Sequence, residues 1–397
     1  MKAIVTGMIA TYPVGGVAWD YGQYVLALEQ LGFEVYYLED TGGPCYDPQK
    51  GDTGDDPRFA VEFLDRSLRY LSPALGDRWH FRGMDDITYG MEKGKFAEVL
   101  AQADLFLNVS GSALLRDEYM NCPCKVLIDT DPGWNHFVNY PKWDASPNWL
   151  NTHGYRAHDH FFTYAERIGQ ADCLLPTMGL EWKPTRPPVV MDRWGAMGQK
   201  MNSSEKSIGK KWTTVMTWNT YGKPLVYDNQ VFGSKEMEFS KIEDLPRQLP
   251  GSSFLLAVGG SGCPAERWRQ LGWEVMDSHL VSSTPEDYRA FIESSRGEFS
   301  VVKNLYSATR SGWFSCRSLC YLAAGLPVVI QDTGFSEFIP TGEGLFAFVD
   351  VITARHAIEL IEENLAHHQQ AARAVAFDYF DSGKVLGKLL AQAGLQA

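Results

Sequence analysis

Residues 303–338 combine cationic side chains with backbone elements that bind phosphate groups. Lys303, Arg310 and Arg317 supply positive charge, and the pattern predicts a helix over residues 315–324. The first turn of such a helix presents free backbone N–H groups and the positive end of the helix dipole. A guanidinium can bind a pyrophosphate through two hydrogen bonds, and a buried arginine needs an anion as its partner. The segment therefore predicts a site for two linked phosphoryl groups.

The residues after this helix predict the element that holds it in place. Gly325 can adopt the left-handed conformation that ends a helix, and Pro327 suits the position just beyond it. Val328–Ile330 is a short apolar run typical of a strand buried in a parallel sheet, and Gly334 begins a second loop. We expect the helix and the strand to present the loops on either side of them to one ligand.

This succession resembles the donor-binding motif of glycosyltransferases with the GT-B architecture, in particular the CgeB-like branch beside glycosyltransferase family 4. The chain keeps the family's Gly-x-Pro-Val at 325–328 and its Gly-x-x-Glu at 334–337, whereas the two family glutamates fall on Gly312 and Cys320. The resemblance implies an α/β fold in which two Rossmann-like domains face each other across a cleft. It also implies that the C-terminal helix crosses back to the N-terminal domain.

The resemblance further implies which residues contact a nucleotide-sugar donor. A loop after the first strand, two segments of the C-terminal half and the helix start would surround the diphosphate and the nucleobase, and Glu337 would meet the sugar or the ribose. Besides the three cations, the residues concerned are Gly15, Gly16, Gly260, Ser261, His279, Leu280, Gly312, Trp313, Phe314, Ser315 and Glu337. A glycine pair at 15–16 is equally typical of a plain turn, whereas three glycines within 259–262 after an apolar strand favour phosphate binding.

Asp20 is the candidate catalytic base, because GT-B enzymes place an acid in this region and a partly buried carboxylate can have a raised pKa. Aspartate is also a good helix N-cap, and the residues by themselves favour that interpretation.

Asp129-Thr130-Asp131 is similar to the Asp-x-Asp metal motif of the other major glycosyltransferase architecture, GT-A. Two Rossmann-like halves and a donor motif late in the chain oppose that assignment. We therefore expect these aspartates to shape a loop of the cleft, with no metal site and no cofactor requirement.

Three candidates for binding the acceptor lie in the N-terminal half: His136, His160 and Glu166. His153, His158 and His160 form a cluster in the sequence, but their spacing matches no zinc motif. A surface loop near the acceptor is the better interpretation.

The composition limits the possible partners. The formal charge is −13, which argues against nucleic acid because phosphate neutralisation needs clustered Lys and Arg. Seven cysteines, an odd number, indicate reduced thiols, and neither a signal peptide nor a membrane-spanning stretch is recognisable. We expect a cytoplasmic protein whose partners are a nucleotide-diphosphate sugar and a small-molecule or glycan acceptor.

Hydrophobic periodicity divides the 397 residues into an acceptor-binding domain at 1–190, a donor-binding domain at 191–375 and a crossing helix at 376–397. The expected strands of the first domain are 3–5, 33–38, 105–109, 125–129, 161–164 and 173–175, and those of the second are 213–217, 254–258, 273–276, 299–302 and 328–330. The Pro-rich segment 183–188 predicts an extended connection, and helices are expected at 285–294, 353–367 and 382–393.

The leading hypothesis is a metal-independent glycosyltransferase of the hexosyltransferase type. Two alternatives stay open, since fold alone does not fix the reaction. One is a sugar-nucleotide 2-epimerase, and the other is a catalytically degenerate protein that only binds a sugar nucleotide.

Overall fold

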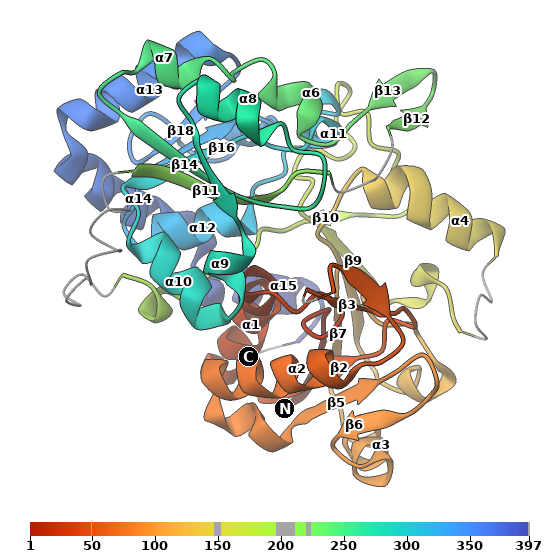
Figure 1. Ribbon diagram of the computed structural model, residues 1–397. Helices are drawn as coiled ribbons and strands as arrows, with labels where there is room; N and C mark the ends of the chain where they lie inside the picture. Colours follow the sequence, from red (N-terminus) through yellow and green to blue (C-terminus); the bar gives the residue numbers. More distant parts are fainter. Residues whose placement is uncertain (49, 147–151, 196–210, 220–223, 396–397) are drawn as a thin grey trace.

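The computed structural model describes residues 1–48, 50–146, 152–195, 211–219 and 224–395, and it contains two α/β halves in contact with each other (Figure 1). Each half is built on one central sheet that is covered by helices. The alternation of strands and helices along the chain produces this arrangement, because parallel strands need a crossover connection between them. The expectation of two Rossmann-like halves is confirmed.

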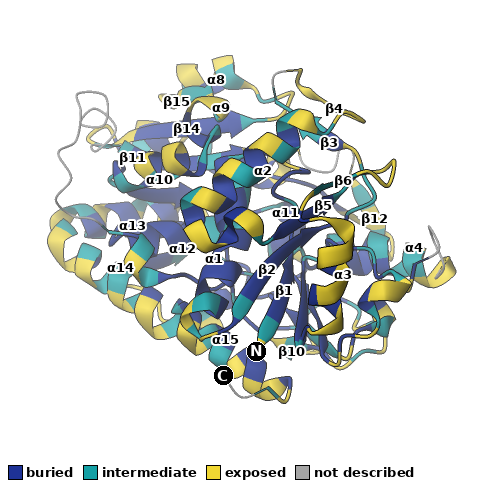
Figure 2. Ribbon diagram, turned by 90° about the horizontal axis from the view of Figure 1, so that it is seen from below, coloured by how far each residue is buried: buried dark blue, intermediate teal, exposed yellow. Residues whose placement is uncertain are grey.

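The sheet of the N-terminal half has the strand order β10-β9-β8-β7-β1-β2-β5-β6, and only the edge strand β6 pairs antiparallel to its neighbour. Its strands are β1 Lys2–Thr6, β2 Glu34–Glu39, β5 Trp79–Arg82, β6 Thr88–Gly90, β7 Leu105–Val109, β8 Lys125–Asp129, β9 His160–Thr163 and β10 Lys183–Pro184. A hairpin of β3 Cys45–Asp47 and β4 Asp52–Gly54 lies outside it, and the helices are α1 Gly15–Gln30, α2 Arg58–Leu71, α3 Lys93–Ala101 and α4 Tyr140–Ala145. β1 and β2 are almost entirely buried, whereas α2 and α3 expose their outer faces (Figure 2).

The sheet of the C-terminal half has the order β15-β14-β11-β16-β17-β18 and is parallel throughout. Its strands are β11 Lys211–Thr217, β14 Ser253–Gly259, β15 Glu274–Asp277, β16 Gly297–Ser300, β17 Val328–Gln331 and β18 Leu345–Phe348, and a separate hairpin pairs β12 Leu225–Tyr227 with β13 Gln230–Phe232. The helices are α6 Glu236–Phe239, α7 Leu245–Gln248, α8 Ala265–Gln270, α9 His279–Ser282, α10 Pro285–Glu293, α11 Asn304–Ala308, α12 Cys316–Ala323, α13 Val351–Glu363, α14 Leu365–Phe380 and α15 Ser382–Gln392.

In each sheet the strand order reverses at one place, between β1 and β7 in the first sheet and between β11 and β16 in the second. Open parallel sheets bind their ligands in the crevice outside the carboxyl ends of the strands at such a switch point. The topology therefore indicates two places for a site, the loops after β1 and β7 and the loops after β11 and β16.

Several details differ from the expectation, among them the sheet strands β5, β6 and β18, which the sequence did not predict. Residues 173–175 form no strand, because Leu175 packs into an apolar cluster with Phe137 and Phe232 instead of pairing with the sheet. The helix expected at 353–367 is interrupted at Asn364, whose side chain accepts a hydrogen bond from His367 N and so begins a new helix. The Pro-rich segment is extended as expected, and two of its residues form the edge strand β10.

The C-terminal helix α15 lies against the N-terminal half beside α1 (Figure 1), which confirms the expected crossing. Lys183 Nζ donates to the carbonyl of Gln392 at 3.0 Å, close to the end of α15. One buried apolar cluster extends through both halves and includes Trp19 and Tyr288. All seven cysteines are free thiols. Among the described residues, no helix has the length and apolar character needed to cross a membrane.

Candidate functional site

The carboxyl ends of the strands of the two halves face each other, and contacts between the following loops join them. Lys303, after β16, lies 2.9 Å from Asp131 Oδ2, after β8. Trp313 Nε1 donates to the carbonyl of Thr130 at 3.1 Å. The loops at the two switch points therefore belong to one interface, which is the position of the candidate site.

Three cations converge at the switch point of the second sheet: Lys235, Lys303 and Arg317. We refer to them as the cation cluster. Burial lowers the pKa of Lys235 to about 7, and the positive charges of Arg317 and Lys303 contribute to the decrease. The carboxylates of Asp131 and Glu298 act in the opposite direction. When Lys235 is protonated, the three cations near two carboxylates leave one positive charge in excess, which favours an anionic ligand.

Lys235 was not among the sequence candidates. The segment Gly233-Ser234-Lys235 precedes the short helix α6, and hydrogen bonds from the backbone of α11 hold it beside Lys303. Asn304 N donates to Ser234 O at 2.9 Å, and Leu305 N donates to Gly233 O at 3.2 Å. A lysine after Gly-Ser at a helix start is the signal that points to this residue in the sequence.

Arg317 corrects one expectation, because its guanidinium already has an anionic partner. Its Nε donates to Glu298 Oε1 at 2.5 Å, its Nη1 donates to the carbonyl of Val215 at 2.9 Å, and its Nη2 bonds Ser300. Glu298 is fully buried on β16. Arg317 therefore adds charge to the cluster while its hydrogen bonds tie α12 to the sheet.

Arg310 is also paired in a way that the sequence did not predict. It is half-exposed, its Nη2 lies 3.0 Å from Glu337 Oε1 and its Nε lies 2.9 Å from Asp172 Oδ2. The buried side chain of Arg167 contacts the same two acids and so connects the halves. Arg310 adopts φ +49°, a strained value for a non-glycine residue. Arg310 and Glu337 thus belong to one ion-pair network across the interface.

The residues before α12 are mostly packed rather than open to a ligand. A Cβ at Gly312, where φ is +76°, would lie 2.9 Å from the Arg167 side chain. Phe314 is buried against Phe335 and Phe380, which corrects its assignment as a donor contact. Ser315 caps α12 by accepting a hydrogen bond from Ser318 N. One of the free backbone N–H groups at the start of α12 is thus already bonded, by the side chain of Ser315.

Trp313 stacks on Tyr306 with ring centroids 4.2 Å apart, and the Tyr306 hydroxyl donates to Asp131 Oδ1 at 2.5 Å. This aromatic pair lies between the halves, beside the cation cluster. It is the part of residues 312–315 that stays close to the candidate site.

Asp20 is not a helix cap, because α1 begins at Gly15 and Asp20 lies in its second turn. Its carboxylate faces α12 and accepts a hydrogen bond from the thiol of Cys316. Burial raises the pKa of Asp20 to about 6, although the Cys316 thiol and the charge of Arg317 act in the opposite direction. The interpretation as an N-cap is wrong, and a carboxylate poised to exchange a proton near neutral pH lies between the halves.

Gly15 and Gly16 allow α1 to approach the C-terminal half closely. A Cβ at Gly15 would lie 2.1 Å from the carbonyl oxygen of Thr284, and one at Gly16 would lie 3.1 Å from the ring of Tyr288. Gly16 N donates to Ser282 Oγ at 3.3 Å. The glycine pair therefore allows the two halves to pack closely at this point.

The other expected donor contacts lie on the loops that follow β14 and β15. Gly260 and Ser261 follow β14 in an exposed loop, and Gly260 has φ +81°. His279 and Leu280 begin the short helix α9 after β15, and Leu280 is 69% exposed. A Cβ at Gly260 would lie 3.4 Å from Thr217, so this glycine lies against the end of β11 at the switch point.

The acceptor candidates occupy three different environments. His136 is fully buried, with Nε2 3.0 Å from Asp129 Oδ2 and Nδ1 2.7 Å from the carbonyl of Pro176. His160 is the first residue of β9, so it lies at the amino end of the strand, on the side of the sheet that faces away from the interface. Burial lowers its pKa. Glu166 follows β9 at the interface, but its carboxylate is held by Arg186 at 2.6 and 2.8 Å. His160 is therefore misplaced for a role at the interface.

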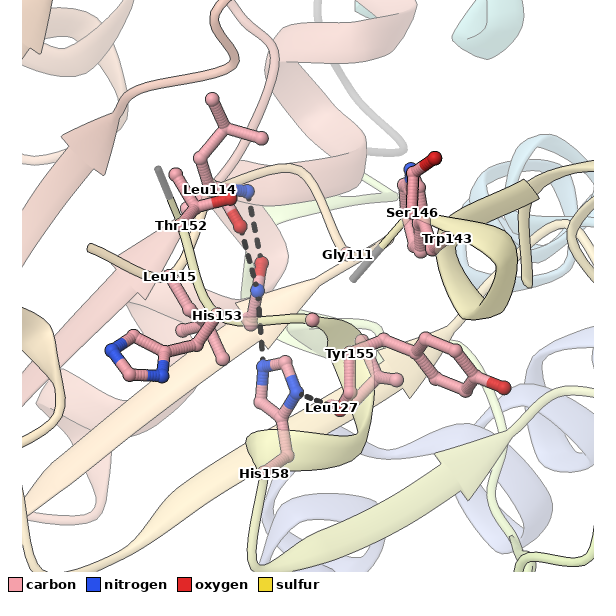
Figure 3. A pocket seen from close by; sticks show the side chains of 13 residues that line it. Gly111, Leu114, Leu115, Leu127, Trp143, Ser146, Thr152, His153, Tyr155 and His158 are labelled. Carbon is pink, nitrogen blue, oxygen red and sulfur yellow. Dashed lines mark hydrogen bonds between the residues drawn. The ribbon is translucent and has the colours of Figure 1, made fainter. Parts of the chain in front are cut away.

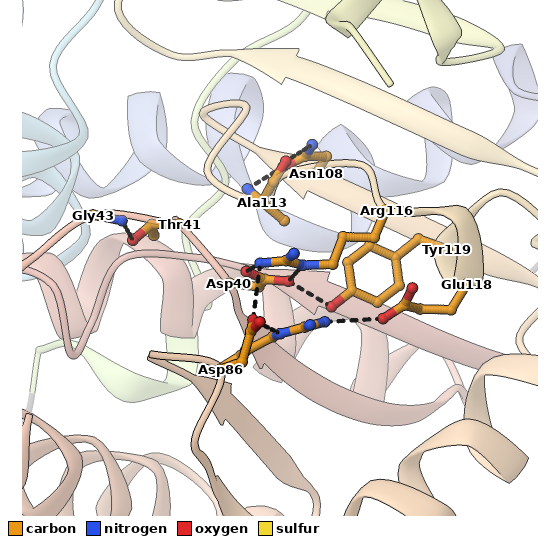
Figure 4. Close-up of polar contacts among 10 residues, drawn as sticks. Asp40, Thr41, Gly43, Asp86, Asn108, Ala113, Arg116, Glu118 and Tyr119 are labelled. Carbon is orange, nitrogen blue, oxygen red and sulfur yellow. Dashed lines mark hydrogen bonds and ion pairs between the residues drawn. The ribbon is translucent and has the colours of Figure 1, made fainter. Parts of the chain in front are cut away.

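The acidic residues that end β2 support the fold. Asp40 is buried and accepts hydrogen bonds from Arg116 at 2.5 and 2.8 Å and from the Tyr119 hydroxyl at 2.8 Å (Figure 4). Glu39 accepts from the backbone of Ala10 and Thr11, which fixes the loop before α1, and burial raises its pKa to about 7. Within the described part of the chain, no group of three His, Cys, Asp or Glu side chains has an arrangement that could hold a metal ion.

A small apolar pocket of about 40 Å³ lies in the N-terminal half between the loop after β7 and the segment before β9 (Figure 3). Leu114, Trp143 and Tyr155 line it. Burial lowers the pKa of His158 to about 4, so the ring is neutral, and it bonds the carbonyl of Tyr155 at 2.6 Å and the Asn108 amide at 3.1 Å. This pocket is small for a ligand, since most ligand pockets measure about 300–1,000 Å³.

No protein-family model matches the sequence, and no curated protein sequence matches it either. Solved structures match nearly the whole chain. A glycosyltransferase from Rickettsia africae ESF-5 is 13% identical with a TM-score of 0.55, over 99% of this chain and 97% of that one. An alpha-glucosyltransferase in complex with UDP is 11% identical with a TM-score of 0.58, over 99% and 100%. Anabaena HepE in complex with UDP and glucose is 11% identical with a TM-score of 0.56, over 99% of both chains.

The alpha-glucosyltransferase was also solved with UDP and a 13-mer DNA that contains an HMU base, at 11% identity and a TM-score of 0.56 over 99% of both chains. At such low identities the similarity shows a shared fold only, and it extends over nearly the whole chain.

Proposed function

Starting from the GT-B fold that this chain has, we propose that the protein is a glycosyltransferase of the hexosyltransferase type. It moves a sugar from a nucleotide-diphosphate donor to an acceptor hydroxyl. The observation that carries the proposal is the cation cluster at the switch point of the second sheet, where the buried Lys235 has its pKa lowered to about 7. A diphosphate there relieves the repulsion among the three cations. A nucleotide diphosphate such as UDP is the leaving group that fits this charge.

The cations supply the main catalytic effect in this proposal. Lys235 and Lys303 stabilise the negative charge that develops on the departing diphosphate, and the diphosphate replaces Asp131 as the partner of Lys303. We propose that no metal ion is needed, because fixed cations supply the charge. Asp20 is the proposed base that accepts the proton of the acceptor hydroxyl, since its pKa of about 6 leaves it ionised at neutral pH.

The proposed acceptor is a small molecule or a glycan. One neighbour of the same fold was solved with DNA. This chain has a formal charge of −13, which disfavours association with a nucleic acid backbone.

A thermal-shift panel tests the proposal directly, because a ligand that binds only the folded protein raises its melting temperature. We expect UDP or another nucleoside diphosphate to raise the Tm, and we expect Lys235→Ala to reduce the shift. Lys50→Ala, an exposed lysine in the N-terminal half, is the matched control. No shift with any nucleoside diphosphate would contradict the proposal.

Two product assays separate the alternatives that share this fold. Turnover of the donor without an acceptor into an epimeric sugar nucleotide identifies a 2-epimerase. Binding of the donor without any turnover, with a range of acceptors present, identifies a protein that only binds sugar nucleotides.

A further inference from the structure

The loop at residues 130–133, after β8, fits closely against the C-terminal half, and we refer to it as the Asp131 loop. The carbonyl of Thr130 accepts a hydrogen bond from Trp313 Nε1 at 3.1 Å. Gly133 has φ +103°, and a Cβ at this position would lie 2.8 Å from the side chain of Leu305 in α11. Contacts at both ends therefore hold the loop against the C-terminal half.

The carboxylate between these two contacts lies in the cation cluster. Asp131 Oδ2 lies 2.9 Å from Lys303 Nζ, and Oδ1 accepts a hydrogen bond from the Tyr306 hydroxyl at 2.5 Å. The negative charge of Asp131 also acts on Lys235, where it opposes the decrease in the pKa of that lysine. Asp131 belongs to the N-terminal half, whereas both lysines belong to the C-terminal half. One half thus supplies an anion to the cations of the other.

Buried hydrogen bonds fix the base of the Asp131 loop. Asp129 is fully buried, and its Oδ1 accepts a hydrogen bond from Asn135 Nδ2 at 2.6 Å. Its Oδ2 accepts from Thr163 Oγ1 at 2.9 Å and lies 3.0 Å from His136 Nε2. These contacts hold the residues on both sides of the loop, so little further entropy is lost when Asp131 pairs with a cation.

The position of this carboxylate also suits a phosphate group. Both groups are anions whose oxygens accept hydrogen bonds from an ammonium and a hydroxyl. The side chain of Asp131 is 32% exposed and that of Lys303 is 14% exposed, so an anion from solution can reach the pair. A phosphate that binds Lys303 must displace Asp131, because two negative charges at hydrogen-bond distance from one ammonium repel each other.

We propose that Asp131 is an internal competitor of the donor, and that in the donor-free protein its carboxylate occupies the position that a phosphoryl group of the donor takes on binding. The inference rests on the proposed function and adds how the same site is regulated. A group on the same chain competes at a high effective concentration. An occupancy of about 90% by Asp131 would lower the apparent affinity for a diphosphate about tenfold, since only the remaining molecules are open to it.

The proposal and a metal site make opposite predictions for this residue. Asp131 is the second acid of the Asp-x-Asp motif at 129–131. A metal ligand would help to bind a diphosphate, so removal of the carboxylate would weaken binding. A competitor opposes the diphosphate, so removal of the carboxylate strengthens binding.

Calorimetry with pyrophosphate and with UDP, in the presence of EDTA, tests the proposal. Asp131→Asn removes the charge and keeps the shape of the side chain, whereas Asp131→Ala removes the whole carboxylate. Asp159→Asn is the matched control, because Asp159 pairs with Lys125 at the same 2.9 Å but lies before β9, at the amino end of the strand. Acetate in place of chloride, at constant ionic strength, returns a carboxylate from solution.

We expect both Asp131 variants to bind pyrophosphate and UDP about tenfold more tightly than the unmodified protein. Asp159→Asn should bind them with unchanged affinity. Acetate should weaken the binding of UDP to Asp131→Ala and have a smaller effect on the unmodified protein, where the position is already filled. The two variants keep the test valid if one of them does not fold, because the side chain of Asp131 is partly exposed.

Unchanged or weaker binding in both Asp131 variants overturns the proposal. Tighter binding that acetate does not reverse also overturns it, because long-range charge alone would then explain the gain. Failure of this proposal leaves UDP binding and its decrease in Lys235→Ala intact. Failure of the proposed function instead abolishes UDP binding in the unmodified protein and in both variants, while pyrophosphate still reports the competition, so the two failures are distinguishable.

Discussion

At the scale of single residues, burial moves two ionisable groups of the interface toward neutral pH from opposite sides. It lowers the pKa of Lys235 to about 7 and raises that of Asp20 to about 6. Arg317 acts on both, since its charge repels Lys235 and stabilises the ionised form of Asp20. Groups with such displaced values gather at functional sites.

The affinity for UDP should depend on the charge of Lys235. A diphosphate next to the ammonium raises the pKa of Lys235 again, so UDP binding takes up a proton above about pH 7. We therefore expect the affinity to fall as the pH rises through that value. Calorimetry in buffers of different ionisation enthalpy measures this uptake, and Lys235→Met should remove both the uptake and the pH dependence.

The stability of the protein gives an independent check on Lys235. The unfolded chain keeps this lysine protonated up to about pH 10, whereas the folded protein releases the proton above about pH 7. The unfolded state binds more protons in this window, so the contribution of Lys235 to stability rises with pH there. Lys235→Met should remove that rise in urea unfolding, and an unchanged slope would exclude the shifted pKa.

Asp20→Asn tests the proposed base. We expect kcat to fall by about 100- to 10,000-fold with little change in UDP affinity, because only the proton acceptor is lost. Activity of the unmodified protein should fall below about pH 6, where Asp20 becomes protonated. The rate of transfer as a function of pH measures both effects. Asp55→Asn, an exposed aspartate, is the control, and equal rates in the two variants would remove Asp20 from the mechanism.

At the scale of elements, the contact between α1 and α10 decides how closely the halves approach. Trp19 Nε1 donates to the carbonyl of Pro285 at 2.8 Å, and Gly15 touches the backbone of Thr284. The glycine pair lies at the N-terminus of α1, so a larger side chain there would separate two helices from different halves.

Gly15→Ala should destabilise the protein by about 1–3 kcal/mol, because its Cβ would lie 2.1 Å from Thr284 O and force the helices apart. Urea unfolding measures the change. A Cβ at Gly94, near the start of α3, meets nothing within 4 Å, so Gly94→Ala should be neutral or stabilising by up to about 1 kcal/mol. Equal destabilisation by the two changes would contradict the role of the close approach.

At the scale of the whole molecule, ion pairs connect the halves at two places, Lys303 with Asp131 and Arg167 with Glu337. Arg167 is 3% exposed, so loss of its partner leaves a buried charge with less compensation. A donor that enters between the halves must exchange at least the first of these pairs. Opening and closing of the halves would thus be coupled to ligand binding.

Glu337→Gln should weaken the closed arrangement, raise the KM for the donor and increase the radius of gyration in X-ray scattering. Glu362→Gln is the matched control, since it breaks the ion pair with Arg296 inside the C-terminal half. If Glu337→Gln behaves like this control in both measurements, the ion pair does not hold the halves together.

Removal of divalent metal tests the proposed metal independence of the whole enzyme. After treatment with EDTA we expect the rate of sugar transfer to be unchanged, because Lys235 and Lys303 are permanently placed at the proposed diphosphate site. Loss of activity that Mg²⁺ or Mn²⁺ restores would show that the fixed cations are not sufficient.

The sequence by itself determined the two sheets, most of their strands but not β5, β6 or β18, and the end of α12 at Gly325, where φ is +74°. These features follow from local rules, since apolar runs, helical periodicity and left-handed glycines depend on near neighbours. The strand expected at residues 173–175 does not form because Leu175 packs against residues distant in the sequence. The helix expected at 353–367 is interrupted because Asn364 caps a new helix.

Only the tertiary structure decided which charged groups meet. The sequence places Arg310 and Arg317 seven positions apart, yet one pairs with Glu337 and Asp172 while the other pairs with the buried Glu298. Lys235 reaches the cation cluster because α11 bonds the segment before α6, a contact between residues about seventy positions apart. Charge interactions depend on distance and burial in three dimensions, and neither quantity can be read from spacing along a chain.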